Sequence, residues 1–243
     1  MLELKDITGG YDASRDILDG VSLSLGKGDS VGVIGLNGSG KSTLGKAVMN
    51  MLPRRTGRVL LDGADVTSYP TSRLAHVGVG FLIQGAPVFD QLTVAENLRL
   101  ATGDETGLKA ATKRLAHIFP RFFPQGGTDI PVCESNPLPT GKNACTTLYR
   151  RRADKLSGGE RHQLALCLAL AKETKLLILD EPSAGLDPAA ADALYKTLGT
   201  IRDTTNVTIL LIEQNVNLAR TFCQRVLVMR QGKLEEAFPK ESC

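Results

Sequence analysis

A glycine-rich segment near the N-terminus has the residues needed to bind phosphate groups. Residues 35–42 read G-L-N-G-S-G-K-S and directly follow the apolar run 30–34, so we expect a strand, a loop and then a helix. Backbone N–H groups of such a loop point into one concavity, and the helix dipole adds partial positive charge there. We expect Lys41 to reach the β- and γ-phosphates of a nucleoside triphosphate and the Ser42 hydroxyl to bind Mg²⁺, the alternative being a strand-to-helix turn that matches by chance. The predicted site comprises Gly35, Leu36, Asn37, Gly38, Ser39, Gly40, Lys41, Ser42 and Thr43.

Two carboxylates and two glutamines follow other apolar runs. Asp180 and Glu181 directly follow the run 176–179. Gln84 directly follows the run 77–83, and Gln214 comes shortly after the run 207–212. A parallel sheet presents its ligand-binding groups at the carboxyl ends of its strands. Either glutamine alone would be interpreted as a surface polar residue.

Two further segments have the residue types of helix starts. Ser157 and Glu160 in the segment L-S-G-G-E have the spacing of a capping box. Asp187 followed by Pro188 is typical of an N-cap and a first helical position.

The elements that must position these side chains are short apolar strands. We expect strands at residues 2–7, 21–25, 30–34, 58–61, 77–83, 175–180, 207–212 and 225–230. Continuous apolar strands separated by helical stretches indicate a parallel sheet covered on both faces. Between residues 84 and 155 the pattern changes to helical periodicity at 94–100 and 108–119, and the Pro- and Gly-rich run 120–141 then predicts a surface excursion.

Composition indicates an ordinary globular protein. The chain has 243 residues, 42% of them hydrophobic, and its 29 Lys and Arg residues nearly balance its 26 Asp and Glu residues. We therefore expect no nucleic-acid partner and interpret the basic cluster 150–152 as a solvated patch. The longest apolar run, 164–171, is far shorter than the about 20 residues that span a bilayer, so any membrane role must come from a partner.

The cysteines and the N-terminus favour a reducing compartment. The first residues alternate apolar with charged side chains, which predicts a strand rather than a signal peptide. An odd number of cysteines without C-x-x-C spacing argues against a disulfide framework and a zinc site. The five cysteines are Cys133, Cys145, Cys167, Cys223 and Cys243.

Taken together, the phosphate loop, the L-S-G-G-E segment and the L-L-I-L-D-E strand resemble the cassette of ABC ATPases over essentially the whole chain. The resemblance implies an α/β fold, with a parallel-sheet P-loop NTPase core, a small antiparallel β subdomain and an inserted helical subdomain. The expected domains are residues 1–83 for the core with its β subdomain, 84–160 for the helical subdomain and 161–243 for the second part of the core.

The same resemblance implies a catalytic role for three residues. Glu181 polarises the attacking water, and Gln84 connects Mg²⁺ and that water to the contact with a membrane partner. Gln214 stands where most ABC cassettes place a histidine that touches the γ-phosphate, so the chain keeps a hydrogen-bonding group there and loses a titratable one. The implied metal site consists of Ser42, Gln84 and Asp180, the last acting through water.

The remaining implied roles concern ATP itself. Tyr11 stacks on adenine, the alternative being a tyrosine that packs in the β subdomain. Ser157, Gly158 and Gly159 grip the γ-phosphate of ATP bound to the opposite cassette, so that two cassettes form a head-to-tail dimer around two ATP molecules.

Local sequence favours one group within the family. The segments 85–98 and 211–215 are similar to those of importer cassettes for branched-chain amino acids, although Asp187 and the long run 120–141 depart from that group. We expect a peripheral ATPase subunit at the cytoplasmic face of the cell membrane, bound to permease subunits and a second cassette. Urea uptake and lipid or polysaccharide export remain open, as do a soluble ABC ATPase that acts on DNA or ribosomes and a regulatory cassette that does not hydrolyse ATP.

Overall fold

A computed structural model describes residues 1–12, 15–85, 87–123 and 148–237. The chain forms two compact units, Met1–Gly85 with Glu173–Cys243 and, between them, Ala86–Lys172. The second unit reaches past residue 160 because helix α5 (Gly158–Ala169) packs against α3 (Val94–Thr102) of the same unit.

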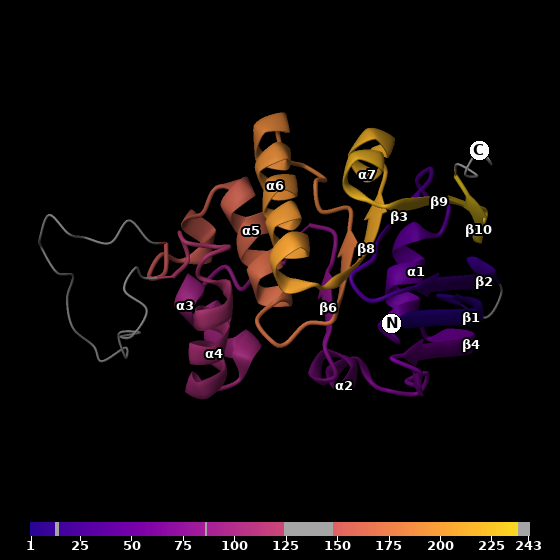
Figure 1. Ribbon diagram of the computed structural model, residues 1–243, viewed down its shortest axis with the longest axis horizontal. Helices are drawn as coiled ribbons and strands as arrows, with labels where there is room; N and C mark the ends of the chain where they lie inside the picture. Colours follow the sequence, from indigo (N-terminus) through magenta and orange to yellow (C-terminus); the bar gives the residue numbers. More distant parts are fainter. Residues whose placement is uncertain (13–14, 86, 124–147, 238–243) are drawn as a thin grey trace, which may run out of the picture. The chain divides into compact units, whose positions relative to one another are not determined.

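The first unit is built on a six-stranded sheet in the order β10-β9-β3-β8-β7-β6 (Figure 1). Its strands from β9 to β6 run parallel, which confirms the predicted α/β class, and β10 pairs with β9 antiparallel at one edge. The central strands are buried along their whole length, because they are covered on both faces and so need apolar side chains on both. The strands are β3 (Ser30–Ile34), β6 (Val79–Leu82), β7 (Leu176–Asp180), β8 (Thr208–Glu213), β9 (Arg225–Arg230) and β10 (Lys233–Glu236).

A second sheet of the first unit has the order β2-β1-β4-β5 and is antiparallel, as the resemblance implied. Its strand β4 begins at Arg54, before the predicted residue 58, because Arg54 and Arg55 pair with Gly10 and Gly9 of β1 although they are polar. The strands are β1 (Leu2–Gly10), β2 (Leu18–Leu25), β4 (Arg54–Leu61) and β5 (Ala64–Asp65).

Helices of the first unit cover the six-stranded sheet (Figure 1). Helix α1 (Lys41–Val48) contacts β1 of the small sheet and β7 and β8 of the large one, so it packs between the two sheets. Helix α7 (Val216–Phe222) contacts β3, β8 and β9. The unit also contains α2 (Thr71–His76) and α6 (Pro188–Thr205), which Asp187 caps by accepting from Ala190 N at 2.9 Å, as predicted.

The second unit is helical in its described part. It contains α3 (Val94–Thr102), α4 (Glu105–Leu115), the 3₁₀ turn Ala153–Lys155 and α5 (Gly158–Ala169). The predicted capping box of α5 is present, since Ser157 N donates to Glu160 Oε2 at 2.9 Å and Glu160 N donates to Ser157 Oγ at 3.3 Å. Thr93 and Glu96 form a second capping box at α3 that the sequence analysis missed.

Several predictions fall partly or wholly outside the described residues. They include most of the excursion 120–141 and Cys133, Cys145 and Cys243. Of the helices that the structure describes, none has the length and apolar character needed to cross a lipid bilayer.

Candidate functional site

The phosphate loop has the backbone shape that its glycines predict. Gly38 and Gly40 have φ angles of 76° and 109°, in the region that side chains with a Cβ avoid. Gly40 is the N-cap of α1, so the first free N–H groups of that helix border the loop. Strand, loop and helix follow one another as expected.

Lys41 lies over this loop. Its side chain is only 4% exposed, and its Nζ donates to Gly35 O at 2.9 Å and to Leu36 O at 3.1 Å. The same ammonium group lies 3.7 Å from Glu181 Oε1. The ammonium group of Lys41 is therefore buried among oxygen atoms, and its carboxylate neighbour is the predicted catalytic residue.

Ser42 and Asp180 meet from opposite ends of the sequence. Ser42 Oγ donates to Asp180 Oδ1 at 2.8 Å, and Asp180 is 1% exposed. Burial raises the pKa of Asp180, an effect that the hydrogen bond from Ser42 opposes. A buried carboxylate beside a hydroxyl is an oxygen donor set that suits Mg²⁺. Ser39 Oγ, in the loop, is also buried and lacks a hydrogen-bond partner among the described residues, as expected of a group that a ligand satisfies.

Glu181 and Gln84 are also in contact. Gln84 Nε2 donates to Glu181 Oε2 at 2.9 Å, so Glu181 connects Lys41 on one oxygen with Gln84 on the other. Glu181 has a φ angle of 46°, which is unusual for a residue with a side chain. Strained backbone of this kind costs on the order of 1 kcal/mol and persists only where the surroundings hold it.

The structure places the other two predicted residues of the first unit near the same elements. Tyr11 is 45% exposed, and its ring centroid lies 5.2 Å from Lys46 Nζ of α1. Gln214 is exposed and follows β8, whose last residue Glu213 pairs with Ile34 at the end of β3. Gln214 is thus at the sheet edge that carries the phosphate loop, and Tyr11 is beside the helix that begins there.

Ser157, Gly158 and Gly159 lie in the second unit, at the start of α5. Ser157 and Gly158 are exposed, and a Cβ atom at Gly158 would meet nothing within 4 Å. The first turn of α5 therefore presents free backbone N–H groups to its surroundings, which is the geometry that binds anions.

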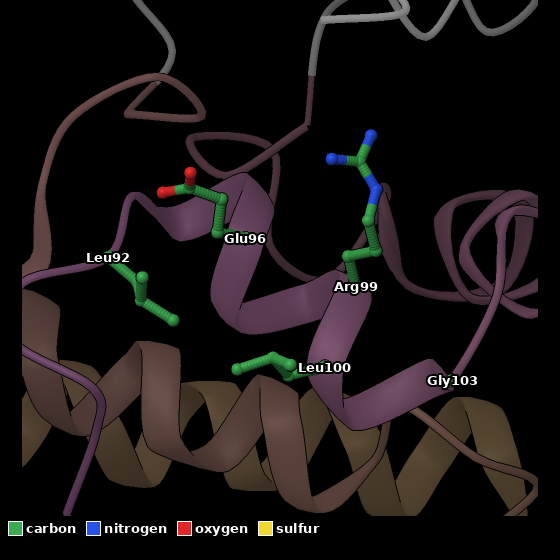
Figure 2. A pocket seen from close by; sticks show the side chains of 5 residues that line it. All are labelled: Leu92, Glu96, Arg99, Leu100 and Gly103. Carbon is green, nitrogen blue, oxygen red and sulfur yellow. The ribbon is translucent and has the colours of Figure 1, made fainter.

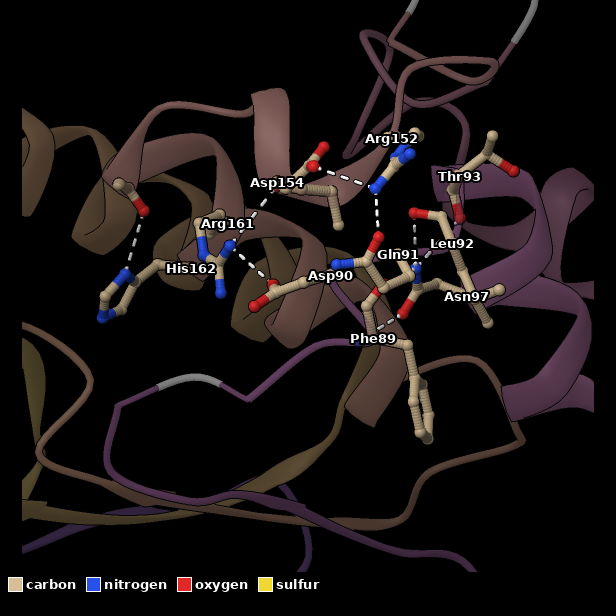
Figure 3. Close-up of polar contacts among 12 residues, drawn as sticks. Phe89, Asp90, Gln91, Leu92, Thr93, Asn97, Arg152, Asp154, Arg161 and His162 are labelled. Atoms are coloured by element: carbon tan, nitrogen blue, oxygen red, sulfur yellow. Dashed lines mark hydrogen bonds and ion pairs between the residues drawn. The ribbon is translucent and has the colours of Figure 1, made fainter.

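A loop of the second unit, residues 89–93, is held by a dense set of hydrogen bonds (Figure 3). Asn97 is 1% exposed; its Oδ1 accepts from Phe89 N at 2.9 Å and its Nδ2 donates to Thr93 O at 2.9 Å. Arg161, directly after the capping box of α5, forms an ion pair with Asp90 at 2.6 Å. The backbone of this loop is fixed although the Phe89 side chain is 62% exposed.

A cavity of about 410 Å³ lies beside this loop on α3 (Figure 2). Two leucines give it an apolar side, and Leu100 is 58% exposed. The residues that line it are Leu92, Glu96, Arg99, Leu100 and Gly103.

Sequence reasoning missed a buried carboxylate of the first unit. Glu213 is a buried carboxylate, and it accepts hydrogen bonds from Ser183 Oγ and from Tyr195 Oη. An available signal was an apolar strand that ends in an acidic residue directly before Gln214.

Comparisons with known proteins identify the family of the chain. A family profile described as ABC transporter matches residues 18–184. The probable branched-chain amino acid transport ATP-binding protein LivF of Archaeoglobus fulgidus is 32% identical over 236 residues, covering 96% of this chain and 90% of that protein. The lipopolysaccharide export system ATP-binding protein LptB of Escherichia coli is 28% identical over 235 residues, covering 96% of this chain and 88% of that protein.

A solved structure shows the same fold. An ATP-binding cassette of an ABC transporter in its ADP conformation is 26% identical, with a TM-score of 0.78, and the match covers 97% of this chain and 89% of that chain. The resemblance inferred from the sequence is therefore confirmed. The chain belongs to the ABC transporter family, in which it is an ATP-binding and ATP-hydrolysing cassette.

Proposed function

We propose that two such cassettes bind two ATP molecules head to tail, and that their closure and hydrolysis drive a substrate through separate permease subunits at the cytoplasmic membrane face. One observation supports the enzymatic part most strongly. Ser42 with Asp180, and Lys41 with Glu181 and Gln84, are brought into contact from three distant segments at one sheet edge.

Each contact has a counterpart in ATP binding. Lys41 exchanges the carbonyl oxygens of Gly35 and Leu36 for β- and γ-phosphate oxygens, and residues 35–43 surround the phosphates with backbone N–H groups. Ser42, Asp180 and Gln84 would hold Mg²⁺, which would neutralise charge on the phosphates. Tyr11 offers an exposed ring for adenine.

Hydrolysis then requires a base within hydrogen-bond reach of a water molecule that is in line with the γ-phosphorus and the leaving oxygen. Glu181 accepts a proton from the attacking water while the water oxygen bonds to the γ-phosphorus. The bond between the γ-phosphorus and the β–γ bridging oxygen then breaks, which releases ADP and phosphate. The contact with Gln84 holds one carboxylate oxygen of Glu181 in place for this step.

The second cassette completes the site in this proposal. Ser157, Gly158 and Gly159 of one cassette bind the γ-phosphate held by the loop of the other. The exposure of Ser157 and Gly158 at the N-terminus of a helix supports this role, because an exposed first turn can reach a ligand on another molecule.

Gln214 is expected to limit the rate of this reaction. An amide orients the γ-phosphate but stabilises the transition state less than an imidazole does, so Gln214→His should raise turnover with little change in ATP affinity. Steady-state phosphate release and calorimetry measure the two quantities, and Asn217→His, the same change at an exposed site on α7, is the control. A large drop in turnover at unchanged affinity would show that the amide is tuned to this site.

Phe89 and Val88 are proposed to contact the permease. Asn97 fixes the Phe89 backbone independently of the side chain, so Phe89→Glu should leave the fold and ATP binding intact and abolish sedimentation with membranes that carry the permease. Met51→Glu places the same charge at an exposed apolar residue of the first unit and should sediment normally. Normal sedimentation of Phe89→Glu would place the coupling surface elsewhere.

The likeness to LivF and the local sequence at 85–98 and 211–215 support amino acid import, whereas the likeness to LptB supports export. Membrane vesicles that contain the chain and its permeases distinguish the two. ATP-driven accumulation of labelled leucine on the side of the cassette supports import, and its absence, with ATP hydrolysis intact, argues against a leucine importer.

A further inference from the structure

Glu213, the last residue of β8, is a carboxylate in an unusual setting. It is 2% exposed, whereas Gln214 and the residues directly after it are exposed. In the part of the chain that the structure describes, no Lys or Arg forms an ion pair with Glu213. A buried charge without a cation is costly unless hydrogen bonds replace those of water.

Four donors supply those hydrogen bonds. Glu213 Oε1 accepts from Ser183 Oγ and, at 2.9 Å, from Tyr195 Oη. Its Oε2 accepts from Gln214 N at 2.8 Å and from Asn215 N at 3.1 Å. Burial, together with the Glu213 charge, raises the pKa of Tyr195, so the phenol keeps its proton and donates it.

Three of these donors, all but Tyr195, belong to the two segments that flank the reacting phosphate in the proposed mechanism. Ser183 is part of the loop 181–187, in which Ala184 N donates to Glu181 O at 3.0 Å. The start of that loop is tied to β8, because Glu181 N donates to Ile212 O at 2.9 Å. The positive φ of Glu181 requires such restraint on both sides.

We propose that Glu213 is a positioning residue that fixes the position of the base Glu181 relative to the turn at Gln214. Through Oε1 it fixes Ser183, two residues after Glu181, and through Oε2 it fixes the backbone N–H of Gln214. A displacement of either segment is then transmitted to the other through one carboxylate. This inference rests on the catalytic roles proposed for Glu181 and Gln214.

Two hydroxyl deletions test it, because each removes one donor from the same oxygen atom. Ser183→Ala releases the loop of Glu181, so kcat should fall by about tenfold while KM and the calorimetric Kd for Mg·ATP stay unchanged. Tyr195→Phe removes the donor on α6, which lies outside both segments, and keeps the ring against Phe222. Its kcat should stay within about twofold of the parent value, although its thermal unfolding midpoint should fall at least as much as that of Ser183→Ala.

Ser183→Thr restores the hydroxyl and should recover most of the lost kcat. Equal losses of kcat in Ser183→Ala and Tyr195→Phe, or a normal kcat in Ser183→Ala, would overturn the proposal, since Glu213 would then only stabilise the fold. If Glu181 is not the base, the result is different, because Glu181→Gln then hydrolyses ATP at the parent rate.

Discussion

Glu181→Gln is expected to lower ATP turnover by at least about a hundredfold and to leave the affinity for Mg·ATP intact. The amide positions water and still contacts Gln84, but it cannot accept the proton, and a general base contributes about 10²–10⁴-fold to such a reaction. Loss of the Glu181 charge also leaves Lys41, 3.7 Å away, free to bind phosphate, so binding should not weaken. Steady-state phosphate release and calorimetry measure the two effects.

A matched control lies at the other end of the same strand. Glu173 is exposed before β7 begins, and Glu173→Gln should hydrolyse ATP at the parent rate. Turnover at the parent rate in Glu181→Gln as well would remove Glu181 from the role of base.

Lys41→Ala should lose both binding and hydrolysis. Its ammonium is buried beside the loop oxygens, and hydrogen bonds to charged groups are worth about 1.5–3 kcal/mol each. Loss of about 3 kcal/mol corresponds to a roughly hundredfold weaker Kd, which calorimetry with Mg·ATP detects directly.

Lys27→Ala is the control for the loss of one positive charge, because Lys27 is exposed in the turn before β3. It should bind Mg·ATP as the parent does. Unchanged affinity in Lys41→Ala would mean that the glycine-rich loop does not form the phosphate cradle.

Much of this site was predictable because it depends on strand ends. Apolar runs identify buried strands, and parallel strands present their carboxyl ends at one edge, so the proximity of Ser42, Asp180 and Glu181 followed from the sequence. The helix caps at Ser157 and Asp187 were predictable for a similar reason, since capping depends on residues three positions apart.

The missed features depend on contacts between distant or polar residues. The strand β10 is mostly charged and exists because it pairs with β9, so its hydrophobic pattern was too weak to reveal it. The network around Glu213 joins residues 183, 195 and 213–215, whose proximity depends on the packing of α6 and β8. The left-handed backbone of Glu181 has no local signal either, because the preference for that region belongs to glycine and asparagine.

In the proposed mechanism each ATP site is completed by the second cassette, so the mass of the Glu181→Gln chain in solution should depend on ATP. The chain has a mass of 26.0 kDa, and light scattering should give about twice that value with saturating ATP and the monomer value without it. Gly158→Glu in the same background puts a carboxylate in the first turn of α5, where an added Cβ atom meets no other atom within 4 Å and the charge should repel the γ-phosphate of the partner. That double variant should bind ATP and stay monomeric; a monomeric Glu181→Gln chain with bound ATP, or an ATP-dependent dimer of the double variant, would contradict the head-to-tail arrangement.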